Sequence, residues 1–143
     1  MAPGADRRDD YRHFLSIPTR WKDVDVYAHV NNVEYYSYFD TVLSGYLVSE
    51  GGLDPRRSPV IGVCAESACR FHDSFGFPET IEAGLRVGEL RTRAARYEIG
   101  LFREGRAEPA ATGHFVHVFV DRETMTPVAI PPALRGALER LLV

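Results

Sequence analysis

The chain has 143 residues, of which 45% are hydrophobic and 26% are charged, and its formal net charge at pH 7 is −3. These values are typical of one globular domain with a hydrophobic core. The negative charge and scattered arginines do not indicate a nucleic-acid-binding surface, and no apolar run reaches the roughly 18 residues that a membrane span needs. The polar start, MAPGADRRDD, lacks the apolar segment of a signal peptide, so we expect a cytoplasmic protein that binds neither nucleic acid nor membrane.

The N-terminal part of the chain is predicted to contain a tail and one strand. Residues 1–10 are polar and are expected to be disordered, whereas residues 11–143 are expected to form a single domain. Hydrophobic and polar residues alternate loosely from Phe14 to Trp21, which predicts a strand with Pro18 at an edge or a bend. A polar loop, KDVDVYAHVNN, follows this strand.

A long helix is predicted from about Val33 to Glu50. Asn31 is a suitable N-cap residue, and Glu34 three positions later completes the pattern of a capping box. Two glycines at positions 51 and 52 are typical of residues that end a helix. Apolar residues cover much of the helix circumference, so we expect the helix to be largely buried. They are Tyr35, Tyr36, Tyr38, Phe39, Val42, Leu43, Tyr46 and Leu47.

Four segments with strand-like patterns follow the helix and are joined by short turns. They are Val60–Phe71, Thr80–Val87, Arg96–Phe102 and Ala110–Val120. A short helix opened by Pro131 and Pro132 completes the chain. Consecutive strands with short connections predict an antiparallel sheet, and one buried helix against one sheet makes two layers. We therefore expect an α+β fold in which a sheet of about five strands wraps around one long central helix.

The cysteine and histidine spacings do not predict a metal site. Cys64 and Cys69 are five positions apart in one predicted strand, so they are expected on opposite faces of the sheet. His114 and His117 are three positions apart in another strand and are likewise expected to face opposite ways. We expect neither a disulfide nor a metal.

The segment RWKDVDVYAHVNNVEYYSYFDT, residues 20–41, combines Arg20-Trp21, Asp23, Asp25, His29-Val30-Asn31-Asn32 and Tyr35. It resembles the hot-dog fold thioesterases of the 4-hydroxybenzoyl-CoA thioesterase and acyl-CoA thioesterase type. It is also similar to the catalytic segment of plant acyl-ACP thioesterases. The resemblance extends more weakly over about residues 13–135, so it agrees with the expected order of elements. It implies the hot-dog fold and the hydrolysis of an acyl thioester to a free acid and the CoA thiol.

The resemblance also implies three catalytic positions. Asp25 matches the catalytic carboxylate, and Asn32 matches the residue whose backbone N–H polarises the thioester carbonyl. His29 matches a histidine of the plant enzymes. Tyr27 stands where those enzymes have an asparagine, which favours the simpler arrangement of a carboxylate and a helix. Glu66 is the nearest match to a further carboxylate used in some branches.

These residue types suit thioester hydrolysis. The first turn of a helix has unpaired N–H groups and the positive end of the helix dipole, which together can stabilise the developing oxyanion. Such a donor is typically worth about 3–4 kcal/mol in acyl transfer. Asp25 could attack the carbonyl carbon directly or take a proton from water, and the sequence leaves both routes open. The ordinary alternative is that Asp25 caps a turn.

Substrate and partners follow from the same resemblance. Tyr27, Tyr35 and Tyr36 are candidate substrate-binding residues, because the family places the acyl pocket at a subunit interface. The chain is expected to form a homodimer, with a homotetramer left open as a dimer of dimers. Acyl-CoA is the expected substrate, with an acyl carrier protein as the alternative carrier. No cofactor is expected, since CoA is part of the substrate.

Two other functions stay open at this point. One is a hot-dog dehydratase or hydratase that acts on acyl thioesters. Gly113-His114-Phe115 faintly resembles the His-Phe-Pro segment of such enzymes, but it lacks the proline. The other is a non-catalytic acyl-CoA-binding protein. The substitution Asp25→Asn separates these functions, because it should abolish hydrolysis only if Asp25 is catalytic.

Overall fold

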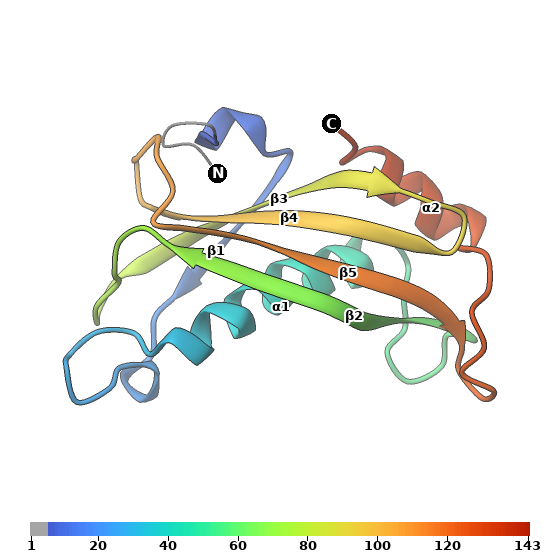
Figure 1. The fold of residues 1–143 in the computed structure, drawn as a ribbon, viewed down its shortest axis with the longest axis horizontal. Helices are drawn as coiled ribbons and strands as arrows, with labels where there is room; N and C mark the ends of the chain where they lie inside the picture. The colour runs from blue at the N-terminus through green and yellow to red at the C-terminus, as the bar shows by residue number, and fades with distance from the viewer. Residues whose placement is uncertain (1–5) are drawn as a thin grey trace.

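The computed structural model describes residues 6–143. A single antiparallel sheet has the strand order β1-β3-β4-β5-β2, and the long helix α1 lies across one face of it (Figure 1). This arrangement confirms the predicted α+β fold. The elements are β1 (His13–Pro18), α1 (Asn32–Ser49), β2 (Val60–Phe71), β3 (Thr80–Leu90), β4 (Ala94–Arg103), β5 (Ala111–Asp121) and α2 (Pro132–Glu139).

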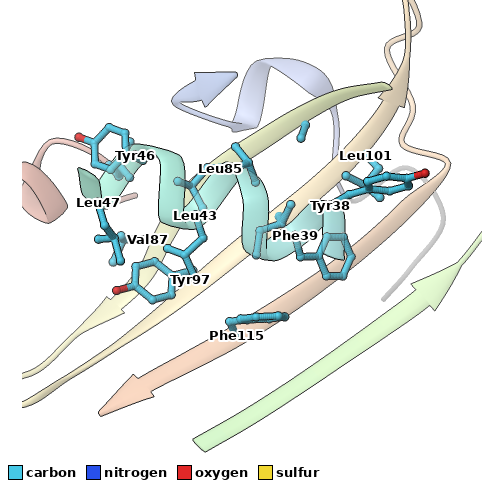
Figure 2. Packing of buried hydrophobic residues seen from close by; sticks show 14 of the residues in the cluster. Tyr38, Phe39, Leu43, Tyr46, Leu47, Leu85, Val87, Tyr97, Leu101 and Phe115 are labelled. Carbon is cyan, nitrogen blue, oxygen red and sulfur yellow. The ribbon is translucent and has the colours of Figure 1, made fainter. Parts of the chain in front are cut away.

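The hydrophobic core lies between α1 and the sheet. Figure 2 shows side chains from α1 and from strands β3, β4 and β5 gathered in this layer. Phe39 of α1 is fully buried and packs edge-on against Phe115 of β5, with the ring centroids 6.3 Å apart. Alternate residues of β3 are fully buried beneath the helix, as the sequence pattern predicts. They are Ile81, Ala83, Leu85 and Val87.

The N-terminal part differs from its prediction in two places. The predicted strand from Phe14 to Trp21 ends early, at Pro18, and Trp21–Asp23 form a 3₁₀ turn, η2. The turn forms because the Asp23 carboxylate accepts the backbone N–H of Arg20 at 2.9 Å. Of the predicted disordered tail, residues 1–5 lie outside the described part of the chain. The remainder contains a second 3₁₀ turn, η1 (Arg8–Asp10).

A β-bulge in β2 changes which face its residues occupy. Cys64 pairs with His117 and Cys69 pairs with Gly113, and the register shifts between Cys64 and Glu66. The partners on β5 are four positions apart, so both cysteines lie on the same face of the sheet. The prediction of opposite faces is therefore wrong, because one extra residue in the bulge reverses the alternation.

Strand β2 forms one edge of the sheet, and from Cys64 to Ala68 its side chains are exposed. An edge strand of this length presents unpaired backbone N–H and C=O groups to any strand that approaches it. The helices of residues 6–143 include none that is long and apolar enough to span a lipid bilayer.

Candidate active site

The segment before α1 folds into a small closed turn that carries Asp25 and His29. Val24 and Val30 form an antiparallel bridge at its base. The Asp25 backbone N–H donates to the His29 carbonyl at 2.9 Å, and the Ala28 N–H donates to the Asp25 carbonyl at 3.0 Å. Ala28 has a φ of +61°, in the left-handed region that favours glycine. Asp25 and His29 are thus neighbours across the neck of the turn.

The Asp25 carboxylate is half-buried and held in one orientation. Its Oδ1 atom accepts the backbone N–H of Tyr27 at 2.9 Å. Within residues 6–143, no donor contacts the other oxygen, Oδ2. One oxygen is therefore anchored by the turn, while the second is free for chemistry.

Helix α1 begins directly after this turn. Asn31 is the N-cap residue, as predicted, and its Oδ1 atom accepts the Val33 N–H at 3.1 Å. The predicted capping box is wrong, because the Asn31 N–H donates to the Asp23 carbonyl at 2.8 Å. The Glu34 carboxylate instead lies 3.6 Å from Arg20 Nη2 and 3.7 Å from Lys22 Nζ.

Asn32 occupies the first position of α1 and is exposed. Its backbone N–H has no acceptor among the residues that the structure describes. The first turn of a helix concentrates such unpaired donors at the positive end of the helix dipole. This N–H is therefore free to bind an anionic or carbonyl oxygen.

The other predicted site residues differ in their exposure. The His29 side chain is exposed, and no hydrogen bond joins its ring to Asp25 or to any other described residue. Tyr27 is 78% exposed beside them. Tyr36 is half-buried against Phe39. Tyr35 is only 2% exposed, because its ring packs on Phe71 and Phe75. Of the three tyrosines, Tyr27 is thus the most accessible in the single chain.

Asp23 is the residue whose position the sequence does not reveal. Its carboxylate pairs with Arg20, at 3.0 Å between Nη2 and Oδ1. The carboxylate is nevertheless fully buried, and it also accepts the Tyr38 hydroxyl at 2.8 Å. Burial alone would raise the pKa of Asp23, but hydrogen bonds from the Arg20 backbone and Tyr38 outweigh it and lower the pKa below its ordinary value.

Glu66 lies away from this site. Cys69 and Gly113 face α1, so Glu66, three residues before Cys69, points to the opposite face of the sheet. There its Oε2 atom contacts His114 Nε2 at 2.7 Å. A hollow of about 360 Å³ occupies the same outer face, and neither Asp25 nor Asn32 lines it. Its charged and titratable lining residues include Arg70, Arg86, Arg96, Glu98 and His114.

Residues 19–138 match the family model of the thioesterase-like superfamily. The chain belongs to the thioesterase-like superfamily. A comparison with curated protein sequences gave no match. The family match confirms the resemblance inferred from residues 20–41, and membership supports thioester hydrolysis as the general chemistry of this fold.

Solved structures agree with this assignment. The PA5185 protein from Pseudomonas aeruginosa strain PAO1 is 49% identical, with 96% of each chain covered and a TM-score of 0.94. The BH1999 gentisyl-coenzyme A thioesterase is 20% identical, with 88% of this chain and 99% of that chain covered and a TM-score of 0.77. The DHNA-CoA thioesterase from Staphylococcus aureus is 17% identical, with 89% and 88% covered and a TM-score of 0.77. These likenesses confirm the predicted hot-dog fold.

Proposed function

We propose that the protein is an acyl-CoA thioesterase that hydrolyses an acyl thioester to a free acid and the CoA thiol. One observation carries the proposal. A carboxylate with one free oxygen, on Asp25, and an unpaired helix N–H, on Asn32, stand at the two ends of a single short turn. Family membership supports the reaction class, and these two groups are the ones that the reaction requires.

In the proposed reaction, the thioester carbonyl oxygen accepts a hydrogen bond from the Asn32 N–H. The helix dipole and this donor stabilise the negative charge that develops on that oxygen. The free oxygen of Asp25 either attacks the acyl carbon or removes a proton from an attacking water. The carbon–sulfur bond then breaks and the CoA thiolate leaves and is protonated.

Both routes have the same overall balance. In the nucleophilic route the acyl group is transferred to Asp25 as a mixed anhydride, and water then hydrolyses this anhydride and restores the carboxylate. In the general-base route water adds directly to the acyl carbon. Each consumes one water and releases one acid and one thiol. His29 and Tyr27, which are exposed next to Asp25, are placed to contact the substrate or to orient the water.

The first test of the proposal is thiol release from short, long, branched and aromatic acyl-CoAs, followed with a thiol-reactive dye. We expect turnover by the wild type and only a small residual rate in Asp25→Asn, with acyl-CoA binding retained. Binding without turnover by the wild type would favour an acyl-CoA-binding protein. Hydration or dehydration of an enoyl or hydroxyacyl thioester, without thiol release, would favour the dehydratase alternative. Turnover only on an acyl carrier protein substrate would replace CoA by acyl carrier protein as the proposed carrier of the acyl group.

We also propose that the protein acts as a homodimer, or as a homotetramer built from such dimers. The exposed edge of β2 supports this, since pairing of two copies along it would satisfy its unpaired backbone groups. Val26 and Val33, which flank the site, are 94% and 62% exposed in the single chain. Light scattering on the purified protein should give twice or four times the chain mass. A fully active monomer would contradict the proposed assembly.

A further inference from the structure

We infer that Asp23 is a positioning residue that holds the Asp25 turn against the first turns of α1. The inference rests on the proposed hydrolysis at Asp25, and it assigns a task to a buried carboxylate that the proposed reaction does not itself use. Asp23 does not touch the reacting atoms. It acts through the backbone on either side of the site.

The Asp23 side chain is held by donors from two directions. Its Oδ2 atom accepts the Arg20 backbone N–H at 2.9 Å and the Tyr38 hydroxyl at 2.8 Å. Its Oδ1 atom accepts Arg20 Nε at 3.1 Å. Asp23 is fully buried and Tyr38 is 2% exposed, so solvent does not weaken the bond between them. The carboxylate therefore cannot turn without breaking several hydrogen bonds at once.

These contacts join the two parts of the proposed site. Tyr38 lies in the second turn of α1, and Asp23 stands two residues before Asp25. The Asp23 carbonyl also accepts the N–H of Asn31, the residue before the proposed oxyanion donor. One residue thus bonds to the helix through its side chain, to the helix cap through its backbone, and to Asp25 through the chain.

Asp23 and its partners Arg20 and Tyr38 form a charged clamp. Such a clamp is a costly way to hold two segments together if stability is the only purpose. Taking a carboxylate out of water is unfavourable, and well-packed apolar residues would often serve stability as well or better. Hydrogen bonds add direction, because each donor must lie at a defined distance and angle. Direction matters in catalysis, where a displacement of about 1 Å can cost about 10²-fold in rate.

Two variants test the clamp, and one serves as a matched control. Tyr38→Phe removes a single oxygen and keeps the ring, so the fold should survive. Asp23→Asn keeps the shape but removes the charge. Tyr46→Phe is the control, because Tyr46 lies on the same helix, is 4% exposed, and donates its hydroxyl to the Ala137 carbonyl at 2.6 Å, away from the turn. The control removes a buried hydroxyl that does not contact Asp23 or the Asp25 turn.

For Tyr38→Phe and Asp23→Asn, we expect kcat to fall by about 10- to 10²-fold while KM changes by less than about 3-fold. For Tyr46→Phe, we expect a loss of melting temperature similar to that of Tyr38→Phe, with kcat within about 2-fold of the wild type. Each substitution is also made in the Asp25→Asn background. If Asp23 acts through Asp25, adding Tyr38→Phe or Asp23→Asn should change the residual rate of Asp25→Asn by less than about 2-fold.

The outcomes separate this inference from the proposed function. Wild-type turnover that depends on Asp25, with Tyr38→Phe unchanged in kcat or no more affected than Tyr46→Phe, would overturn the positioning role alone. An equal loss in the wild-type and Asp25→Asn backgrounds would also overturn it, since the effect would then be general destabilisation. An inactive wild type, or an Asp25→Asn variant with wild-type turnover, would overturn the proposed function and this inference with it.

Discussion

Gly113 offers a direct test of the packing between α1 and the sheet. A Cβ atom added at this position would collide with Phe39 Cε2 and with the Ala68 carbonyl oxygen, and it would lie 2.8 Å from Phe39 Cζ. Carbon atoms pack best at about 3.5–4.0 Å, so the Phe39 ring would have to move by about 0.7 Å or more. Phe39 is fully buried, and the Ala68 oxygen belongs to the backbone of β2, so neither can move freely.

We therefore expect Gly113→Ala to reduce the free energy of unfolding by about 3 kcal/mol, the upper part of the usual range for overpacking. For a chain of 143 residues this corresponds to a melting temperature lower by about 10 °C. Gly136→Ala makes the same chemical change in α2, where nothing lies within 4 Å of the added Cβ. It should stabilise the protein by about 0.5–1 kcal/mol, because alanine favours helix over glycine.

The assay is urea unfolding followed by circular dichroism, with all proteins at the same concentration because self-association would affect stability. Gly113→Ala should lower the midpoint and Gly136→Ala should raise it. A Gly113→Ala protein within about 0.5 kcal/mol of the wild type would refute the reasoning. It would mean that α1 does not press on β5 as the structure has it.

Three further substitutions have expected outcomes of their own. Ala28→Gly should stabilise the protein by about 0.5 kcal/mol, as relief of the strain at φ +61° outweighs the added freedom of the unfolded chain, and a lower melting temperature would contradict this. Asn31→Ala should cost about 1 kcal/mol in urea unfolding through loss of the Val33 cap, and an unchanged midpoint would argue against the cap. Burial lowers the pKa of His117 to about 4 from an ordinary 6.5. As the pH falls, the histidine is therefore protonated in the unfolded chain before it is protonated in the folded protein, and the free energy of unfolding should fall by up to about 3 kcal/mol from pH 6.5 to 4. His117→Leu should flatten this fall, and an equally steep loss in the variant would assign it to other groups.

Hydrophobic periodicity, together with capping residues, glycines and prolines at the ends of elements, was enough to locate most elements of the fold. The segment Val60–Phe71 is predicted and observed with the same ends, and α1 starts and ends one residue earlier than expected. These signals succeed because strand alternation and helix caps are local properties of the chain. The bulge after Cys64 is not local in this sense, since it depends on how β2 pairs with β5. Without it, every side chain beyond the bulge is assigned to the wrong face.

The candidate site likewise has some features that the sequence predicts and others that it does not. The order of Asp25, His29 and Asn32 along the chain could be found from the motif, and the turn brings Asp25 and His29 together at its neck. The clamp on Asp23 could not be found, because its partner Tyr38 is 15 positions away and the burial of both depends on the folded helix. The left-handed conformation of Ala28 could not be found either. Glycine is the residue that usually signals this conformation, and an alanine gives no such signal.

The most direct test of the central claim compares two substitutions at Asn32, measured as kcat/KM on the acyl-CoA that the wild type hydrolyses best. Asn32→Pro removes the proposed backbone donor, and proline is tolerated at the first position of a helix. Asn31 already has the extended conformation that a following proline requires, with φ −63° and ψ 141°. Asn32→Ala removes only the exposed side chain and keeps the N–H.

We expect Asn32→Ala to stay close to the wild type and Asn32→Pro to lose about 10²- to 10³-fold, the usual effect of removing one oxyanion donor. Circular dichroism should show both variants folded. A folded Asn32→Pro protein with wild-type turnover would contradict the account, because the helix N–H would then have no part in the reaction.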